Sequence, residues 1–120
     1  MANRWSVEEE RLLATVWLEV HDSEELVNER SFWNAVTQRF NNQTEGQDRN
    51  KNSITAQWNR MNIECRRYNA IYKELQRTSQ DTNRLTNANQ IYYERYGREL
   101  YYQQVWFTLR NTRAWDRYDE

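Results

Sequence analysis

Residues 52–77 carry the side chains with the clearest capacity for binding chemistry. One side of this stretch combines polar, basic and small groups at helical spacing: Thr55, Ala56, Asn59, Arg60, Asn62, Ile63, Arg66 and Arg67. Arginine, asparagine and threonine side chains hydrogen bond to the edges of bases and to phosphates. The mixture therefore predicts a surface that binds nucleic acid, with an ordinary solvated helix face as the alternative.

Positive charge gathers around this stretch, although the whole chain is slightly acidic. The formal net charge is −1, yet residues 49–77 hold seven basic and two acidic side chains. Arg49 and Lys51 stand at the start of the stretch, where the unpaired N–H groups of a helix N-terminus also attract anions such as phosphate. Residues 1–32 hold three basic and eight acidic side chains. We therefore expect a local positive face on an acidic protein.

Residue types that support catalysis or metal binding are sparse. His21 is the only histidine and Cys65 the only cysteine, and neither has a partner at the spacing of metal ligands. The sequence also lacks a Gly-rich phosphate loop and a nucleophile motif. We therefore expect no enzymatic activity, no metal site and no cofactor. Cys65 is expected to be a buried thiol, and His21 an exposed residue at a helix end.

The helix that must position the binding side chains is defined by its apolar stripe. Apolar residues recur at alternating steps of four and three, at Ile54, Trp58, Met61, Cys65, Tyr68, Tyr72 and Leu75. This spacing places all of them on one side of an α-helix, and no Gly or Pro interrupts the run. The pattern predicts one long helix over residues 52–77, with Ser53 as its N-cap.

Two shorter helices are expected before the long one. Ser6 and Glu9 have the spacing of a capping box, and the apolar rhythm that follows ends near His21. The acidic residues 21–30 read as a loop with one helical turn within 24–27. A second helix is predicted from Ser31, with an apolar side formed by Phe32, Trp33, Val36 and Phe40.

Two more helices are expected after the long one. The first is capped by Asp81 or Thr82, directs Leu85, Ala88, Ile91, Tyr92 and Tyr96 inward, and ends at Gly97. The second covers about residues 99–110 and buries Tyr102, Val105, Trp106 and Leu109. Trp115 is expected to fasten the chain end to the body.

Length and composition favour a single all-α domain. The 120 residues include no proline and two glycines, and the large area of 17 aromatic rings compensates for an apolar share of 38%. The core is expected to contain Trp5, Trp17, Trp33, Trp58 and Trp106. No apolar run approaches the ~18 residues of a membrane span, so we expect a soluble, intracellular protein without membrane contact.

Several of these segments resemble a known family. The start Arg4-Trp5-Ser6-Val7-Glu8-Glu9-Glu10, the pair Phe32-Trp33 and the run from Ser53 to Asn62 are similar to a Myb/SANT-like domain of the trihelix type. The segments 67–72, 92–97 and 105–110, with Trp115, resemble the Myb-like accessory proteins of PIF/Harbinger (Ping/Pong-type) transposons and related no-apical-meristem-associated plant proteins. The resemblance spans nearly the whole chain.

The resemblance implies a helix-turn-helix variant. Its three-helix unit would cover residues 4–77, and a helical extension over 81–118 would pack on it to complete a single compact domain. It further implies sequence-preferring binding of double-stranded DNA through the third helix, by a transposon accessory or a domesticated transcription or chromatin factor. A nuclear location and partnership with a DDE-type transposase, or a protein derived from one, are implied as well.

The resemblance also assigns roles to individual residues of the third helix. The positions expected to read bases are Thr55, Asn59, Arg60 and Asn62, with Ile63 nearby. The positions expected to contact phosphates are Arg49, Lys51, Ser53, Arg66 and Arg67. For each arginine, a solvated or ion-paired surface group is the alternative.

A different function is open at this stage. In a SANT-like protein-interaction module, the acidic first helix and a tyrosine-rich tail would form the working surface. The tyrosines are Tyr92, Tyr93, Tyr96, Tyr101 and Tyr102. The partner would be a transposase, a histone tail or a second copy of the chain, giving a homo-oligomer.

Overall fold

The computed structural model describes residues 4–23 and 28–116, and within these it contains six α-helices and no strand. The helices are α1 (Val7–His21), α2 (Glu29–Gln43), α3 (Lys51–Thr78), α4 (Arg84–Tyr96), α5 (Gln103–Leu109) and α6 (Arg113–Asp116). The all-α class and the long third helix are confirmed. The prediction of five helices missed the short α6, and the turn predicted at 24–27 lies outside the described residues. None of the described helices is long and apolar enough to cross a membrane.

The capping box predicted at the first helix is confirmed, whereas the start predicted for the second helix at Ser31 and the N-cap predicted for the long helix at Ser53 were wrong. Ser6 and Glu9 form the predicted capping box at α1. At α2 and α3, however, the caps are Asn28 and Asn50, whose side-chain oxygens accept the N–H groups of Ser31 and Ser53 at 2.8 Å. Both serines therefore lie one turn inside their helices. An asparagine three residues upstream competes as well as serine for the N-cap role.

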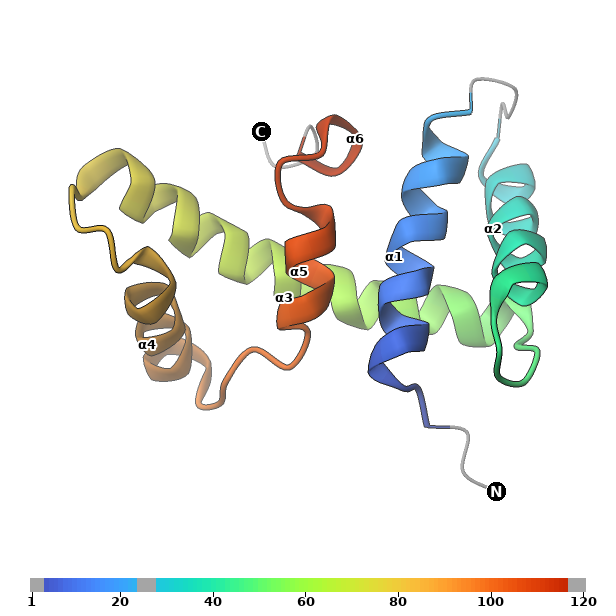
Figure 1. The fold of residues 1–120 in the computed structure, drawn as a ribbon, viewed down its shortest axis with the longest axis horizontal. Coiled ribbons are helices and arrows are strands. Elements are labelled where there is room, and N and C mark those ends of the chain that lie inside the picture. The colour runs from blue at the N-terminus through green and yellow to red at the C-terminus, as the bar shows by residue number, and fades with distance from the viewer. Residues whose placement is uncertain (1–3, 24–27, 117–120) are drawn as a thin grey trace.

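The helices form two layers (Figure 1). In the front layer α1 lies beside α2 and α5, and it packs against both. The first half of α3 runs behind these helices and crosses them, while α4 folds back along the second half of α3. The molecule measures 43 × 37 × 19 Å, so its shortest dimension is about two helix diameters.

The core beneath α1 and α2 is built on stacked tryptophans. Trp17 and Trp58 stack with ring centroids 4.6 Å apart, and Trp33 is half-buried against Trp58. Trp5 is likewise half-buried and covers Phe40. His21, predicted to be exposed, is instead half-buried because its ring stacks on Trp17 at 5.0 Å.

A second aromatic cluster joins α3 to the C-terminal helices. Tyr68 contacts Tyr92 of α4 and Trp106 of α5, with ring centroids 6.0 and 4.7 Å away. Its hydroxyl donates to Asn89 of α4 and accepts from Gln103 of α5. Because Tyr68 is fully buried, this tyrosine holds three helices together.

The C-terminal helices follow the prediction in part. The helix predicted over about residues 99–110 is shorter, because α5 begins only at Gln103 and ends at Leu109. Its predicted inner face is nevertheless buried, with Val105, Trp106, Leu109 and the preceding residue Tyr102 between 0% and 8% exposed. In α4 only Ala88 and Tyr92 are buried, while Leu85 and Tyr96 keep more than a third of their surface exposed. The apolar side of α4 is thus narrower than its sequence pattern suggested.

The C-terminal end of α4 was predicted correctly, but its N-terminal end was not. Gly97 ends the helix with φ 78°, as expected for a glycine C-cap. The N-cap is Asn83, and it makes no side-chain cap hydrogen bond, so the assignment to Asp81 or Thr82 was wrong. Asp81 instead accepts the backbone N–H of Asn83 and the side-chain amide of Asn87.

Candidate nucleic-acid interface

The outer side of α3 carries an open strip of side chains. Buried residues of this helix face α1, α2, α4 and α5. The opposite side points away from the layer of α1, α2 and α5 (Figure 1), and α4 borders it at Arg67. The outer strip consists of the exposed residues Asn52, Ala56, Asn59, Arg60, Ile63, Arg67 and Ala70. The only acidic residue between Lys51 and Lys73 is Glu64, which is buried and paired with Arg98. The outer strip is therefore positively charged and free of carboxylates.

Asn59 and Arg60 are consecutive residues near the middle of the outer strip, and both are exposed. One guanidinium nitrogen of Arg60 donates to the side-chain oxygen of Gln57 at 2.6 Å. Gln57 is 3% exposed, so this hydrogen bond anchors Arg60 to a rigid part of the protein. Arginine has five N–H donors, and a single bond to Gln57 leaves capacity for an external acceptor.

The first turn of α3 is more enclosed than the outer strip. Thr55 is half-buried and its hydroxyl donates to the backbone oxygen of Lys51 at 3.0 Å. With Glu29, Arg30 and Trp33, these two residues line a hollow of about 350 Å³ between α2 and α3. The backbone N–H of Ser53 is already bound to Asn50. In the first turn of α3, Lys51 and Thr55 are therefore accessible to solvent through this hollow.

The structure gives Asn62 and Arg66 partners inside the protein. The indole N–H of Trp115 donates to the Asn62 side chain at 2.7 Å, and the Arg66 guanidinium lies 4.1 Å above the Trp115 ring. Trp115 itself is fully buried. Both residues therefore lie on the flank of α3 that α6 covers, next to the outer strip rather than on it.

These contacts continue along the flank as a polar docking seam that the sequence reasoning did not find. The seam consists of Asn62, Arg66, Asn69 and Lys73. Asn69 accepts the indole N–H of Trp106 at 2.9 Å, and Lys73 forms an ion pair with Asp116 at 2.7 Å. The sequence does contain a pattern that could have indicated this seam. Its four residues are separated by four, three and four positions beside the apolar stripe, and two tryptophans later in the chain can donate hydrogen bonds to them.

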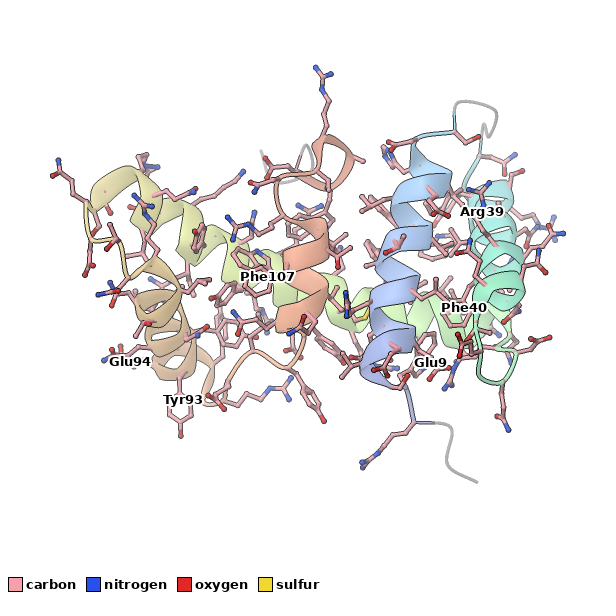
Figure 2. The ribbon with its side chains drawn as sticks, in the orientation of Figure 1. Glu9, Arg39, Phe40, Tyr93, Glu94 and Phe107 are labelled. Carbon is pink, nitrogen blue, oxygen red and sulfur yellow. The ribbon has the colours of Figure 1, made fainter. Side chains whose placement is uncertain are left out.

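Arg49 faces inward as well. Its guanidinium donates to both carboxylate oxygens of Glu9 at 3.1 Å and lies 4.3 Å above the Trp5 ring. The side chains of Arg49 and Glu9 are only 10% and 12% exposed. Burial alone would raise the pKa of Glu9, but hydrogen bonds from Arg49 and from the Ser6 N–H outweigh it and lower the pKa. Figure 2 shows Glu9 at the start of α1.

Arg67 is the last basic residue of the outer strip. It is exposed, and its guanidinium lies 4.9 Å from the ring centroid of Tyr96 in α4. Arginine held over an aromatic face loses less freedom on binding an anion than a fully mobile side chain does. Arg67 is therefore well placed to contact a phosphate at the edge of the strip.

Glu10 in the first turn of α1 is a partly buried carboxyl group. Burial and the neighbouring Glu9 raise the pKa of Glu10 to about 7. Burial also raises the pKa of Tyr102, with Glu10 contributing, although a hydrogen bond with Gln57 opposes the shift. Glu10 thus lies near Tyr102, the hydrogen-bond partner of Gln57, and its charge changes close to neutral pH.

The tyrosine-rich tail is divided between core and surface. Tyr92 and Tyr102 are 1% and 8% exposed, so the prediction that they belong to a working surface was wrong. Tyr93, Tyr96 and Tyr101 are exposed, at 56%, 39% and 72%. Figure 2 shows Tyr93 pointing away from the body of the protein at α4.

No protein-family model, curated protein or solved structure matches this chain. Among the described residues, no group of three His, Cys, Asp or Glu side chains is arranged to hold a metal ion. Cys65 is buried and its thiol lies 3.8 Å from the backbone oxygen of Tyr102. Burial raises the pKa of this thiol.

Proposed function

We propose that this chain is a Myb/SANT-like protein of the trihelix type that binds double-stranded DNA, with α3 in the major groove. In this function it acts in the nucleus as a transposon accessory or a domesticated transcription or chromatin factor. Its protein partner is a DDE-type transposase or a protein derived from one. The observation that carries the proposal is the outer strip of α3, which is open, basic and free of carboxylates.

The dimensions of the outer strip suit the proposed contact. From Asn52 to Arg67 the helix rises ~23 Å, and a major groove of ~12 Å width admits a helix with its side chains. The layer of α1, α2 and α5 lies on the other side of α3 and does not obstruct this approach. A duplex can therefore meet the strip without rearrangement of the fold.

We assign the predicted DNA-binding residues to three roles according to their exposure and contacts. Asn59 and Arg60 are exposed and are assigned to base edges, because Asn pairs with adenine and Arg with guanine. Arg67 is assigned to a phosphate, as are Lys51 and the adjoining Thr55 at the hollow beside α2. The remaining predicted residues are assigned to the stability of the fold. Arg49 pairs with the largely buried Glu9, Asn62 and Arg66 contact the fully buried Trp115, and the backbone N–H of Ser53 is bound to the N-cap Asn50.

The test is duplex binding by the wild type and by Asn59→Ala/Arg60→Ala, using DNA selected from a random library. Each lost base contact is worth ~1–3 kcal/mol of discrimination, so we expect sequence preference to fall by tenfold or more. Arg67→Ala should instead weaken binding to all sequences and reduce the slope of log K against log salt by ~1.

A matched control removes the same groups from the other layer. Arg11→Ala/Asn34→Ala changes one exposed arginine on α1 and one exposed asparagine on α2. This variant has the same change in charge and should retain both affinity and preference. If the wild type binds no duplex in a salt-sensitive manner, or if Asn59→Ala/Arg60→Ala keeps its preference, the proposed function is wrong.

A second candidate function is favoured by the exposed aromatic rings of the C-terminal helices. Tyr93 and Tyr101 present more than half of their surface to solvent, and such rings are frequent anchors in protein interfaces. A protein-interaction module would lose its partner on Tyr93→Ala/Tyr101→Ala while duplex binding stayed intact. Retention of every co-purifying partner by this folded variant would exclude the tyrosine surface.

A further inference from the structure

Ile63 is an aliphatic side chain in the centre of a polar and cationic surface. It is 52% exposed, although α3 buries its other large apolar residues wholly or in part. Asn59 precedes it by four residues, Arg60 by three, and Arg67 follows it by four. On a helix these separations make the three residues its direct neighbours, with Cβ atoms ~5–6 Å apart.

This arrangement brings together the three kinds of group that distinguish bases in the major groove. Arg60 supplies N–H donors, Asn59 supplies both a donor and an acceptor, and Ile63 supplies an apolar surface. The apolar feature of the major groove is the 5-methyl group of thymine. The basic rim of Arg60 and Arg67 matches the phosphates that flank such a group.

A second copy of the chain is a poorer occupant for the same surface. An antiparallel contact centred on Ile63 would bring Arg60 of one copy toward Arg67 of the other. The outer strip offers no carboxylate to offset this repulsion. Charge therefore favours a polyanion over self-association at this site.

We propose that Ile63 is a specificity-determining residue that reads the 5-methyl group of a thymine. The inference rests on the proposed binding of double-stranded DNA by α3. The axial rise from Arg60 to Ile63 is ~4.5 Å, against ~3.4 Å for each base-pair step. The thymine thus lies within about two base pairs of the base that Arg60 contacts.

The experiment replaces each thymine of the selected duplex, one at a time, by deoxyuridine, which removes only the methyl group. Wild-type binding should weaken about fourfold at one position, the value of one buried methyl group. Ile63→Ala should bind the thymine and deoxyuridine duplexes equally. Arg60→Ala, as the control, should bind more weakly overall but keep the fourfold difference. Circular dichroism melting checks that both variants remain folded.

The outcomes separate this inference from the function on which it rests. If the wild type binds DNA but tolerates deoxyuridine at every position, Ile63 reads no methyl group and the proposed function stands. The inference also fails if Ile63→Ala keeps the difference, or if this substitution converts a dimeric wild type to a monomer in size-exclusion chromatography. If the wild type binds no duplex, both proposals fail together.

Discussion

The ion pair between Glu9 and Arg49 predicts that Arg49→Met destabilises the fold rather than weakening an anion contact. Both side chains are about nine-tenths buried, and the guanidinium makes two hydrogen bonds to the carboxylate. The same guanidinium donates to the backbone oxygen of Arg4 and lies over the Trp5 ring. Removing it leaves the Glu9 carboxylate without its principal partner in a poorly solvated place.

The expected loss follows from this burial. Removing one member of a buried ion pair costs 3–5 kcal/mol of stability. Because the Glu9 side chain is still slightly exposed, we expect a loss at the lower end of this range, about 3 kcal/mol. With an unfolding entropy of ~2.1 cal/mol/K per residue, the 120-residue chain should melt about 12 °C lower. Glu9→Leu/Arg49→Met replaces both charges by apolar groups and should regain most of the loss.

The pH dependence supplies an independent measurement. Because the pKa of Glu9 is lowered in the folded state, the pair contributes its full stability above the ordinary value of 4.5. That contribution is lost as the pH falls through the lower, folded-state pKa. Urea denaturation from pH 7 to pH 3 should therefore show the wild type and Arg49→Met converging in acid.

A different result would support the interpretation drawn from the sequence, in which Arg49 contacts a phosphate. If Arg49→Met keeps its melting temperature within about 2 °C of the wild type, the ion pair contributes little to the fold. If the same variant also lowers the salt slope of duplex binding by ~1, Arg49 is a phosphate contact. The inward assignment of its side chain would then be wrong.

Two further substitutions test neighbouring parts of the structure. Since the pKa of Glu10 is raised to about 7 from 4.5, the folded chain holds a proton between these values that the unfolded chain has lost. Stability should therefore fall as the pH rises through this window, and Glu10→Gln should gain about 1–2 kcal/mol at pH 8, since solvent screens part of the effect. The control Glu8→Gln, at an exposed site, should change little, and an equal gain in both variants would exclude burial as the cause. Trp115→Phe keeps a buried ring but removes the N–H that binds Asn62, so chemical denaturation should show a loss of about 1–3 kcal/mol. An unchanged free energy of unfolding would mean that this hydrogen bond does not hold α6 to α3.

The long third helix was predictable because its signal is local and repeated. The alternation of four and three residues from Ile54 to Leu75 gives a buried or half-buried stripe that no breaker interrupts. The start of this helix was harder to place, because Asn50 and Ser53 are both good caps three residues apart. The structure selects Asn50, whose side chain reaches the Ser53 N–H.

The candidate site was less predictable, because its membership depends on contacts across the chain. Periodicity places Asn62 and Arg66 near the outer side of α3 but does not reveal that Trp115, about fifty residues later, covers them. From the sequence alone, Arg49 and Arg67 are equally good candidates for a phosphate contact. Its ion pair with Glu9 is set by the packing of the loop after α2 against α1. Only tertiary structure separates these arginines.

The docking seam and the outer strip are linked because they lie on the same helix. Indole N–H groups of Trp106 and Trp115 bind Asn69 and Asn62, two turns apart, and both rings are fully buried. Together with the apolar stripe, these bonds fix the rotation of α3 about its own axis. A rotation of 100° would carry the seam into the place of the outer strip, since neighbouring residues on a helix differ by that angle. In the proposed function, the C-terminal helices therefore determine which side chains face the groove although they contact no base themselves.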